Sequence, residues 1–168
     1  MKNMLFSVVA VLVLLATGFF TAHAATLSDI DPCGLIAPEA VYAAFPALKS
    51  MKKQTIGPNT TCSYLDKFGI SALMVSVHRD NGESAKGMLS GFGEGYRLEP
   101  VAGLGQEAAM AISLGNQKYN IPGGEVAELY IKKDGRALLL APARIKVKAD
   151  GSSFEKLKNM AMKMLDKL

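Results

Sequence analysis

Stretches of β-favouring residues follow one another through the middle of this 168-residue chain, with a helical pattern near each end. Turn signals rich in Gly, Pro, Asn and Asp separate the stretches, which predicts short connections between antiparallel strands. Asp134-Gly135 lies between two apolar runs and is the strongest signal for a β-hairpin. From residue 143 to 150 charged and apolar residues alternate, so this segment either extends the last strand or follows a bend at Pro142. We expect strands near residues 52–56, 60–66, 70–79, 96–103, 106–115, 124–133 and 136–143, and a short helix across 83–89.

Helical signals lie on both sides of these strands. Pro38 and Glu39 predict the first turn of a helix that ends near Pro46. Near the C-terminus Ser152 and Glu155 form the S-x-x-E pattern of a capping box, followed by an apolar stripe at helical spacing. The predicted fold is therefore α+β, with the N-terminal helix and the C-terminal amphipathic helix packed on an antiparallel β-sheet.

The first residues have the features of a secretory signal peptide. Lys2 precedes an apolar run from Met4 to Phe20, and Ala22-His23-Ala24 forms a small-x-small cleavage site. Cleavage after Ala24 divides the chain into a leader, 1–24, and a single periplasmic or secreted domain, 25–168. No cysteine follows this site, so a lipobox is absent. The alternative is an uncleaved anchor, because about 17 apolar residues approach the minimum for a membrane span; we expect no transmembrane segment after signal cleavage.

The chain has two cysteines, Cys33 and Cys62. Export would place them where thiols are oxidised, and an even number favours a disulfide. Closing a loop of about 28 residues would stabilise the fold by roughly 3.5 kcal/mol in the chain-entropy model. A redox pair or a metal site are competing interpretations, but C-x-x-C spacing and nearby histidines are missing.

Charge and histidine content give little support for catalysis or nucleic-acid binding. Without Lys2 the chain carries 18 basic and 15 acidic residues, and a net charge of about +3 is too small and dispersed to indicate nucleic acid. After leader cleavage the only histidine is His78, beside Arg79 and Asp80, where we expect a solvated residue at the end of a strand. Acidic residues are numerous enough for a catalytic pair, but the sequence does not pair them.

Two motifs superficially suggest cofactors. The segment GLGQEA, 103–108, matches a dinucleotide-binding pattern, but it lies among antiparallel strands, so we predict a tight turn leading into a strand. Met160, Met162 and Met164 suggest copper, but alternate residues of a helix diverge and do not converge on one ion. We therefore predict no catalytic residue, no cofactor and no metal site.

Two connections, GFGEGY at 91–96 and NQKYNIPGGE at 116–125, combine glycine with an aromatic residue. Loops of this kind on a rigid scaffold often carry recognition. The competing interpretation is that both are simply long links between strands. The candidate residues for binding a ligand or partner are Phe92, Glu94, Tyr96, Lys118, Tyr119 and Asn120.

Three motifs taken in order resemble the DUF3558-type exported proteins and lipoproteins. They are DPCGL near residue 31, TTCSY near residue 62, and VAGLGQEA ending at residue 108. The matching positions are Asp31, Pro32, Cys33, Leu35, Cys62, Tyr64, Gly103, Leu104, Gly105, Glu107 and Ala108. The resemblance implies a disulfide-tethered fold similar to the PsbP/Mog1-like sandwich, with a curved antiparallel sheet and helices. Many such proteins are lipid-anchored, which this leader does not predict, and the family supplies no catalytic residue.

The function expected from the sequence is that of a non-enzymatic exported binding or accessory protein of the cell envelope. Its partner would be an unknown envelope protein or a small ligand, and we expect no binding to nucleic acid. One alternative is a small-molecule carrier with a pocket between sheet and helix. Another is a carboxylate-dependent hydrolase, which would need two close acidic groups with pKa values pushed apart.

Overall fold

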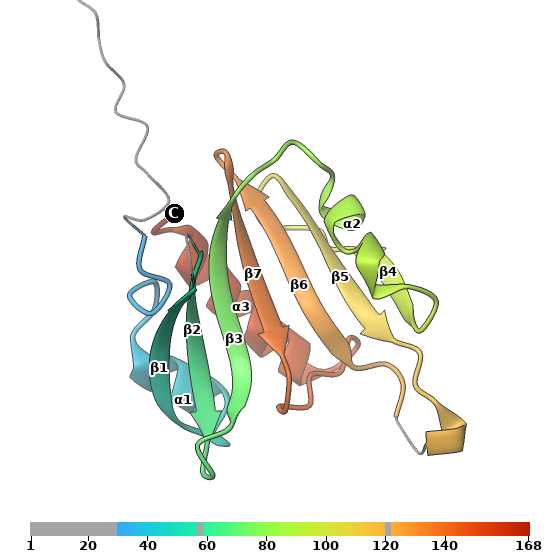
Figure 1. Cartoon of the computed structure of the whole chain (residues 1–168), viewed down its shortest axis with the longest axis horizontal. Coiled ribbons are helices and arrows are strands. Elements are labelled where there is room, and N and C mark those ends of the chain that lie inside the picture. Colours follow the sequence, from blue (N-terminus) through green and yellow to red (C-terminus); the bar gives the residue numbers. More distant parts are fainter. Residues whose placement is uncertain (1–29, 57–58, 120–121) are drawn as a thin grey trace, which may run out of the picture.

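A seven-stranded antiparallel sheet forms the centre of the computed structural model, which describes residues 30–56, 59–119 and 122–168 (Figure 1). The strand order is β1-β2-β3-β7-β6-β5-β4. This confirms the α+β class and the antiparallel sheet. The strands are β1 Leu48–Ile56, β2 Asn59–Asp66, β3 Ser71–Arg79, β4 Tyr96–Pro100, β5 Glu107–Ser113, β6 Val126–Lys133 and β7 Arg136–Pro142.

Two antiparallel meanders, β1 to β3 and β4 to β7, join where β3 pairs with β7. The chain therefore has to travel from β3 to the far edge strand β4. This connection passes over one face of the sheet and contains α2, Ala85–Met88, and the 3-10 helix η2, Ser90–Phe92 (Figure 1). A second 3-10 helix, η3 (Gln117–Tyr119), follows β5.

Helices α1, Pro38–Ala44, and α3, Ser152–Leu165, lie on the other face, which we call the helix face (Figure 1). Val41 of α1 and Leu157 of α3 are fully buried in the main core with side chains of the sheet. A smaller core lies on the opposite face, where Ala85 and Leu89 cover Tyr130 and neighbouring alanines. Helix α2 therefore shields only part of the opposite face.

The helix starts differ in how well the sequence predicted them. Pro38 occupies the first turn of α1, as expected, after the N-cap Ala37. The predicted capping box at Ser152 is wrong: Gly151 is the N-cap of α3, and no side chain caps this helix. The Ser153 hydroxyl instead accepts a hydrogen bond from the Lys148 amide at 3.0 Å, so a serine fixes the incoming chain rather than the helix end.

The segment after β7 follows a bend and does not extend the strand. The amides of Ala143 and Arg144 both donate to the Ala72 carbonyl oxygen, which turns the chain away from β7. Beyond the bend Ile145 and Val147 are buried, whereas the alternating Arg144, Lys146 and Lys148 are exposed, as the alternation predicted.

Strand β1 also differs from expectation, since it begins at Leu48 and not near residue 52. Leu48 is buried, so the chain enters the core directly after α1. At the other end of the sheet Asp134 and Gly135 both have positive φ and close the predicted hairpin between β6 and β7. Among the described residues, no helix has the length and apolar character needed to cross a membrane.

Candidate functional site

The DPC motif has a structural role. The predicted disulfide between Cys33 and Cys62 is present, with the two Cα atoms 5.0 Å apart. The Asp31 carboxylate accepts a hydrogen bond from the Cys33 amide at 2.9 Å and another from the Lys53 ammonium at 2.9 Å. The hydrogen bond from Lys53 is the main reason that the pKa of Asp31 is below its usual value. Because Lys53 is paired with Cys62 across β1 and β2, the motif fastens the segment before α1 to these strands.

The GLGQEA segment is a turn leading into β5, as predicted. The Gln106 amide donates to the Lys132 carbonyl oxygen, and the Gln106 side chain exchanges hydrogen bonds with Asp134 of the β6–β7 hairpin. Gly105 has a φ of +57°, and a Cβ there would lie 2.3 Å from the Lys132 carbonyl oxygen. The glycine is therefore required by the close approach of this turn to β6.

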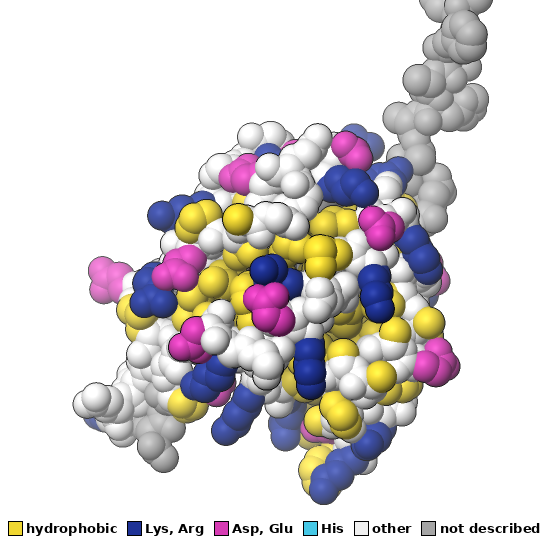
Figure 2. Space-filling model, turned by 180° about the vertical axis from the view of Figure 1, so that it is seen from behind, with side chains coloured by type: hydrophobic (Ala, Val, Ile, Leu, Met, Phe, Trp, Pro, Cys, Tyr) yellow, Lys and Arg dark blue, Asp and Glu magenta, His cyan; other side chains and the backbone are white. Residues whose placement is uncertain are grey.

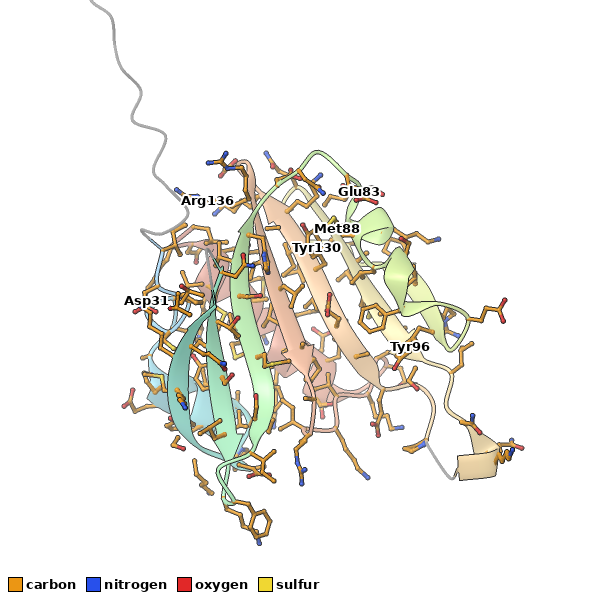
Figure 3. The ribbon with its side chains drawn as sticks, viewed as in Figure 1. Asp31, Glu83, Met88, Tyr96, Tyr130 and Arg136 are labelled. Atoms are coloured by element: carbon orange, nitrogen blue, oxygen red, sulfur yellow. A yellow bond between two sulfur atoms is a disulfide. The ribbon has the colours of Figure 1, made fainter. Side chains whose placement is uncertain are left out.

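The glutamate of the same motif positions α2. Glu107 accepts a hydrogen bond from the Ala85 amide at 2.8 Å, at the start of α2. Lys132 lies 3.0 Å from Asp80 and 3.9 Å from Glu107, and it donates to the Glu83 carbonyl oxygen. Figure 3 shows Glu83, which precedes α2, and Met88, the last residue of α2, near the upper end of the sheet. These charges hold the crossover connection on the sheet, and the cation between the two carboxylates makes them a poor acid–base pair.

The opposite face also presents an uncovered surface beside α2. Cross-strand pairing places Gln54, Thr61 and Ser76 in one row, which continues through Leu139 to Tyr130 under α2. The row changes from polar side chains over β1, β2 and β3 to apolar ones over β7 and β6. A depression of about 390 Å³ lies in the polar part. We call it the polar groove; it is lined by Gln54, Asn59, Thr61, Ser63, Met74 and His78.

His78 is the titratable residue of the polar groove. The solvated environment expected from the sequence is incorrect, because the side chain is half-buried at the groove. Burial lowers the pKa of His78, so the imidazole is neutral at pH 7. None of the described residues that line the polar groove is an acid, a lysine or an arginine, so they offer hydrogen-bonding groups without net charge.

Ser76 and His78 form a pair that the sequence interpretation missed. Their Oγ and Nε2 atoms are 2.8 Å apart. The signal was available, since residues two apart on a strand point to the same face. In the part of the chain that the structure describes, no carboxylate hydrogen-bonds the other imidazole nitrogen, and Ser76 is only 6% exposed. The pair therefore lacks the orienting acid and the access that a nucleophile requires.

Glu128 is a half-buried carboxylate on β6, two residues before Tyr130. Burial raises the pKa of Glu128. It also raises the pKa of Tyr130, whose phenol is further affected by the charges of Asp80, Glu83 and Glu128. Tyr130, labelled in Figure 3, belongs to the small core with Ala85 and Leu89. These groups border the small core under α2 and do not line the polar groove.

The candidate loop residues lie at a different place from the polar groove. Phe92 and Tyr96 are in contact, with ring centroids 4.8 Å apart, and Glu94 is exposed between them. Lys118 is exposed in η3, which also contains Tyr119, whereas Asn120 lies outside the described residues. The Leu114 amide donates to the Gly95 carbonyl oxygen at 2.9 Å, so the two loops start side by side at one end of β4 and β5.

Three depressions border α3. One of about 130 Å³ lies between α1 and α3, with Lys156 and Lys163 at its border. The other two measure about 280 Å³, beside Phe45 and Ile145, and about 330 Å³, beside Lys133 and Leu165; these two are near the lower limit for the pocket of a small-molecule carrier. Met160 and Met164 are buried in the core and Met162 is exposed, so these methionines do not converge. No cluster of three or more His, Cys, Asp or Glu side chains suited to a metal occurs within the described ranges.

Comparison of the chain with protein-family models, with curated proteins and with solved structures gave no match.

Proposed function

We propose that this protein is a non-enzymatic exported binding or accessory protein of the cell envelope, and that a partner occupies the polar groove. The observation that carries the proposal is the uncovered part of the opposite face, where neutral hydrogen-bonding side chains line about 390 Å³. Ser63 and Ser76 are 8% and 6% exposed although no helix in the described part of the chain covers them, so the groove is recessed rather than flat. A recessed site with a few hydrogen-bonding groups fits recognition better than a flat solvated sheet surface does.

The chemistry of the groove specifies the kind of partner. Its donors and acceptors are amides, hydroxyls and one neutral imidazole, so the occupant is an uncharged polar segment, such as serine-, threonine- or asparagine-containing peptide. Addition of a strand to the edge strand β1 is disfavoured, because Lys49, Lys52 and Lys53 are exposed along it and lysines on an edge oppose pairing. The partner therefore contacts the face of β1 to β3 and not their edge.

The proposed location is the periplasm or the exterior, after cleavage following Ala24. The disulfide supports an oxidising compartment. The leader lies outside the described residues, so its removal is tested chemically. Intact mass of protein recovered from the envelope should correspond to a chain starting at Ala25; a mass that includes residues 1–24 would contradict cleavage and favour the retained anchor.

Two other functions receive less support. A carrier with a pocket between sheet and helix would have to use one of the depressions that border α3, which measure about 130, 280 and 330 Å³ and are each smaller than the polar groove. A carboxylate-dependent hydrolase would need two close acidic groups with separated pKa values, whereas Asp80 and Glu107 share the Lys132 ammonium. The kinship with DUF3558-type proteins also stays a proposal; it is supported by the structural roles of Asp31, Gly105 and Glu107.

Cross-linking in living cells tests the proposed function. A photo-reactive residue at Gln54, on the border of the polar groove, should capture one specific envelope protein, whereas the same residue at Lys163 on α3 should not. Thr61→Trp fills the groove and should abolish capture. Thr55→Trp is the matched control, because the same change lies on the other side of the same sheet. Equal capture at Gln54 and Lys163, or capture unaffected by Thr61→Trp, would overturn the proposal.

A further inference from the structure

The end of the sheet that carries the β2–β3 hairpin combines exposed hydrophobic side chains with basic ones. Phe68 and Ile70 in this hairpin are 71% and 44% exposed, and Leu114, after β5, is 55% exposed. Antiparallel pairing brings the two segments to the same end, because β5 ends where β6 begins and β7 ends where β3 begins. We call this surface the basic end; it comprises Phe68, Ile70, Leu114, Lys67, Arg144 and Lys146.

Side chains connect the two exposed segments. Lys146 borders one depression together with Leu114 and a second together with Arg144. Arg144 in turn lies 3.4 Å from the Asp66 carboxylate at the base of the hairpin. The basic end is therefore one continuous surface and not a set of unrelated exposed residues. In Figure 2, Lys and Arg predominate among the charged side chains along the lower edge of the molecule, where hydrophobic side chains are also exposed.

The tip of the hairpin is built to hold its hydrophobic residues outward. The Asp66 carboxylate accepts hydrogen bonds from the Phe68 amide at 2.8 Å and from the Ile70 amide at 3.0 Å. These backbone hydrogen bonds lower the pKa of Asp66, and the one from Ile70 has the largest effect. Lys67 lies 4.9 Å from the centre of the Phe68 ring. The acid of this tip is thus engaged by the turn and by Arg144, while the lysine stays beside the exposed phenylalanine.

We propose that the basic end docks on the surface of an anionic lipid bilayer, with Phe68 and Ile70 entering the interface and Lys67, Arg144 and Lys146 near the headgroups. Charge complementarity favours this occupant. Lys146 has no ion-pair partner among the described residues, and Asp66, the acid of the hairpin, is already paired with Arg144, so its negative charge does not oppose the headgroups. The opposite end of the sheet exposes the carboxylates of Glu83 and Asp134 beside the exposed Arg79, so charges of both signs are mixed there.

The shape of the surface favours a bilayer over a protein. Phe68, Ile70 and Leu114 project from two loops separated by basic residues, and a protein partner would need separate, shape-matched pockets for them. A bilayer interface accepts hydrophobic side chains without such matching and attracts nearby lysines and arginines. The inference goes beyond the proposed function, because it concerns how the protein lies on a membrane and needs no groove partner.

Flotation with lipid vesicles tests the proposal, using protein purified after export. Vesicles of phosphatidylcholine with about one third phosphatidylglycerol should bind the protein, more weakly as salt increases, and pure phosphatidylcholine should bind it far less. Lys67→Gln and Lys146→Gln should each weaken binding about fivefold, and Phe68→Ser with Ile70→Ser at least about tenfold. Lys86→Gln on α2 is the control for the lysine variants, and Met51→Ser with Met162→Ser is the control for the hydrophobic pair. Neither control should weaken binding to the vesicles.

A fluorescence measurement gives an independent readout, because the chain contains no tryptophan. Phe68→Trp should show a blue shift with anionic vesicles, and Met162→Trp on α3 should not. No binding to anionic vesicles at low salt, or equal weakening by the control variants, would overturn the proposal. It would also be overturned if sedimentation showed that Phe68 and Ile70 hold two copies of the chain together.

Discussion

The Lys132 ammonium lies 3.0 Å from the Asp80 carboxylate and also donates to the Glu83 carbonyl oxygen, so one side chain of β6 ties the crossover connection to the sheet. Lys132→Met should loosen α2 while leaving the main core intact. We expect exchange of the Ala85 amide to become about tenfold faster or more, corresponding to the loss of hydrogen bonds from a charged donor. Lys86→Met, an exposed change on α2, is the control; equal exchange in both variants would show that Lys132 does not anchor the helix.

Two glycines of one turn allow the energetic cost of a left-handed backbone to be measured separately from the cost of a steric clash. Gly103 and Gly105 both have positive φ, but a Cβ at Gly103 would meet nothing within 4 Å, whereas one at Gly105 would meet the Lys132 carbonyl oxygen at 2.3 Å. Gly103→Ala should cost about 1–2 kcal/mol of unfolding free energy from the left-handed backbone alone. Gly105→Ala should cost at least about 2 kcal/mol more, because the strand must move. Similar urea midpoints for the two variants would contradict the close approach.

Reduction of the disulfide should destabilise the domain without abolishing its fold. In the chain-entropy model, a separation of 29 residues corresponds to about 3.5 kcal/mol. Urea unfolding with and without reductant measures this difference, and Cys33→Ser with Cys62→Ser should be insensitive to reductant. Native protein should contain no titratable thiol, since the structure has no free cysteine. Two reactive thiols in freshly isolated material would rule out the disulfide in the functional form.

His78 should make stability depend on pH near neutrality. Burial lowers the pKa of His78 in the folded protein, so at a pH between the two pKa values the unfolded chain is protonated at this residue and the folded chain is not. The stabilisation is present above the unfolded pKa of about 6.5 and is lost as the pH falls through the folded pKa. The stability difference between the natural chain and His78→Gln should therefore decline as the pH falls below about 6.5. A difference that stays constant between pH 7.5 and 5 would show that His78 is exposed to solvent.

Tyr64 carries a buried hydroxyl without a hydrogen-bond partner in the described part of the chain. Burial is the main cause that raises the pKa of Tyr64 to about 12. Tyr64→Phe should increase the unfolding free energy by about 1 kcal/mol, because an unsatisfied buried polar group is removed. Tyr42→Phe is a matched control, since its half-buried ring packs edge-to-face on Tyr64 and it should change stability little. Destabilisation by Tyr64→Phe would reveal a partner for the hydroxyl.

Local sequence signals predicted much of the secondary structure, and they did best where one residue type has one strong backbone preference. Pro38 opens α1, and Asp134-Gly135 makes the turn between β6 and β7 because both positions need positive φ. The local signals failed at the start of α3, where neighbouring residues could each cap the helix or hold the incoming chain. Ser152 and Glu155 match a capping box, but the chain arriving from Lys148 recruits Ser153 and leaves Gly151 as the N-cap.

The α+β class, the antiparallel strands and the pairing of Cys33 with Cys62 follow from local patterns, because periodicity, turn residues and a single pair of cysteines leave few alternatives. Which distant residues come into contact depends instead on how the strands are ordered in the sheet. The pairing of β3 with β7 sends the crossover over one half of a sheet face, and so leaves the polar groove open beside it. The same pairing brings Phe68 and Leu114, far apart in the sequence, to one end of the sheet. Such contacts depend on long-range strand order, which no local pattern in the chain specifies.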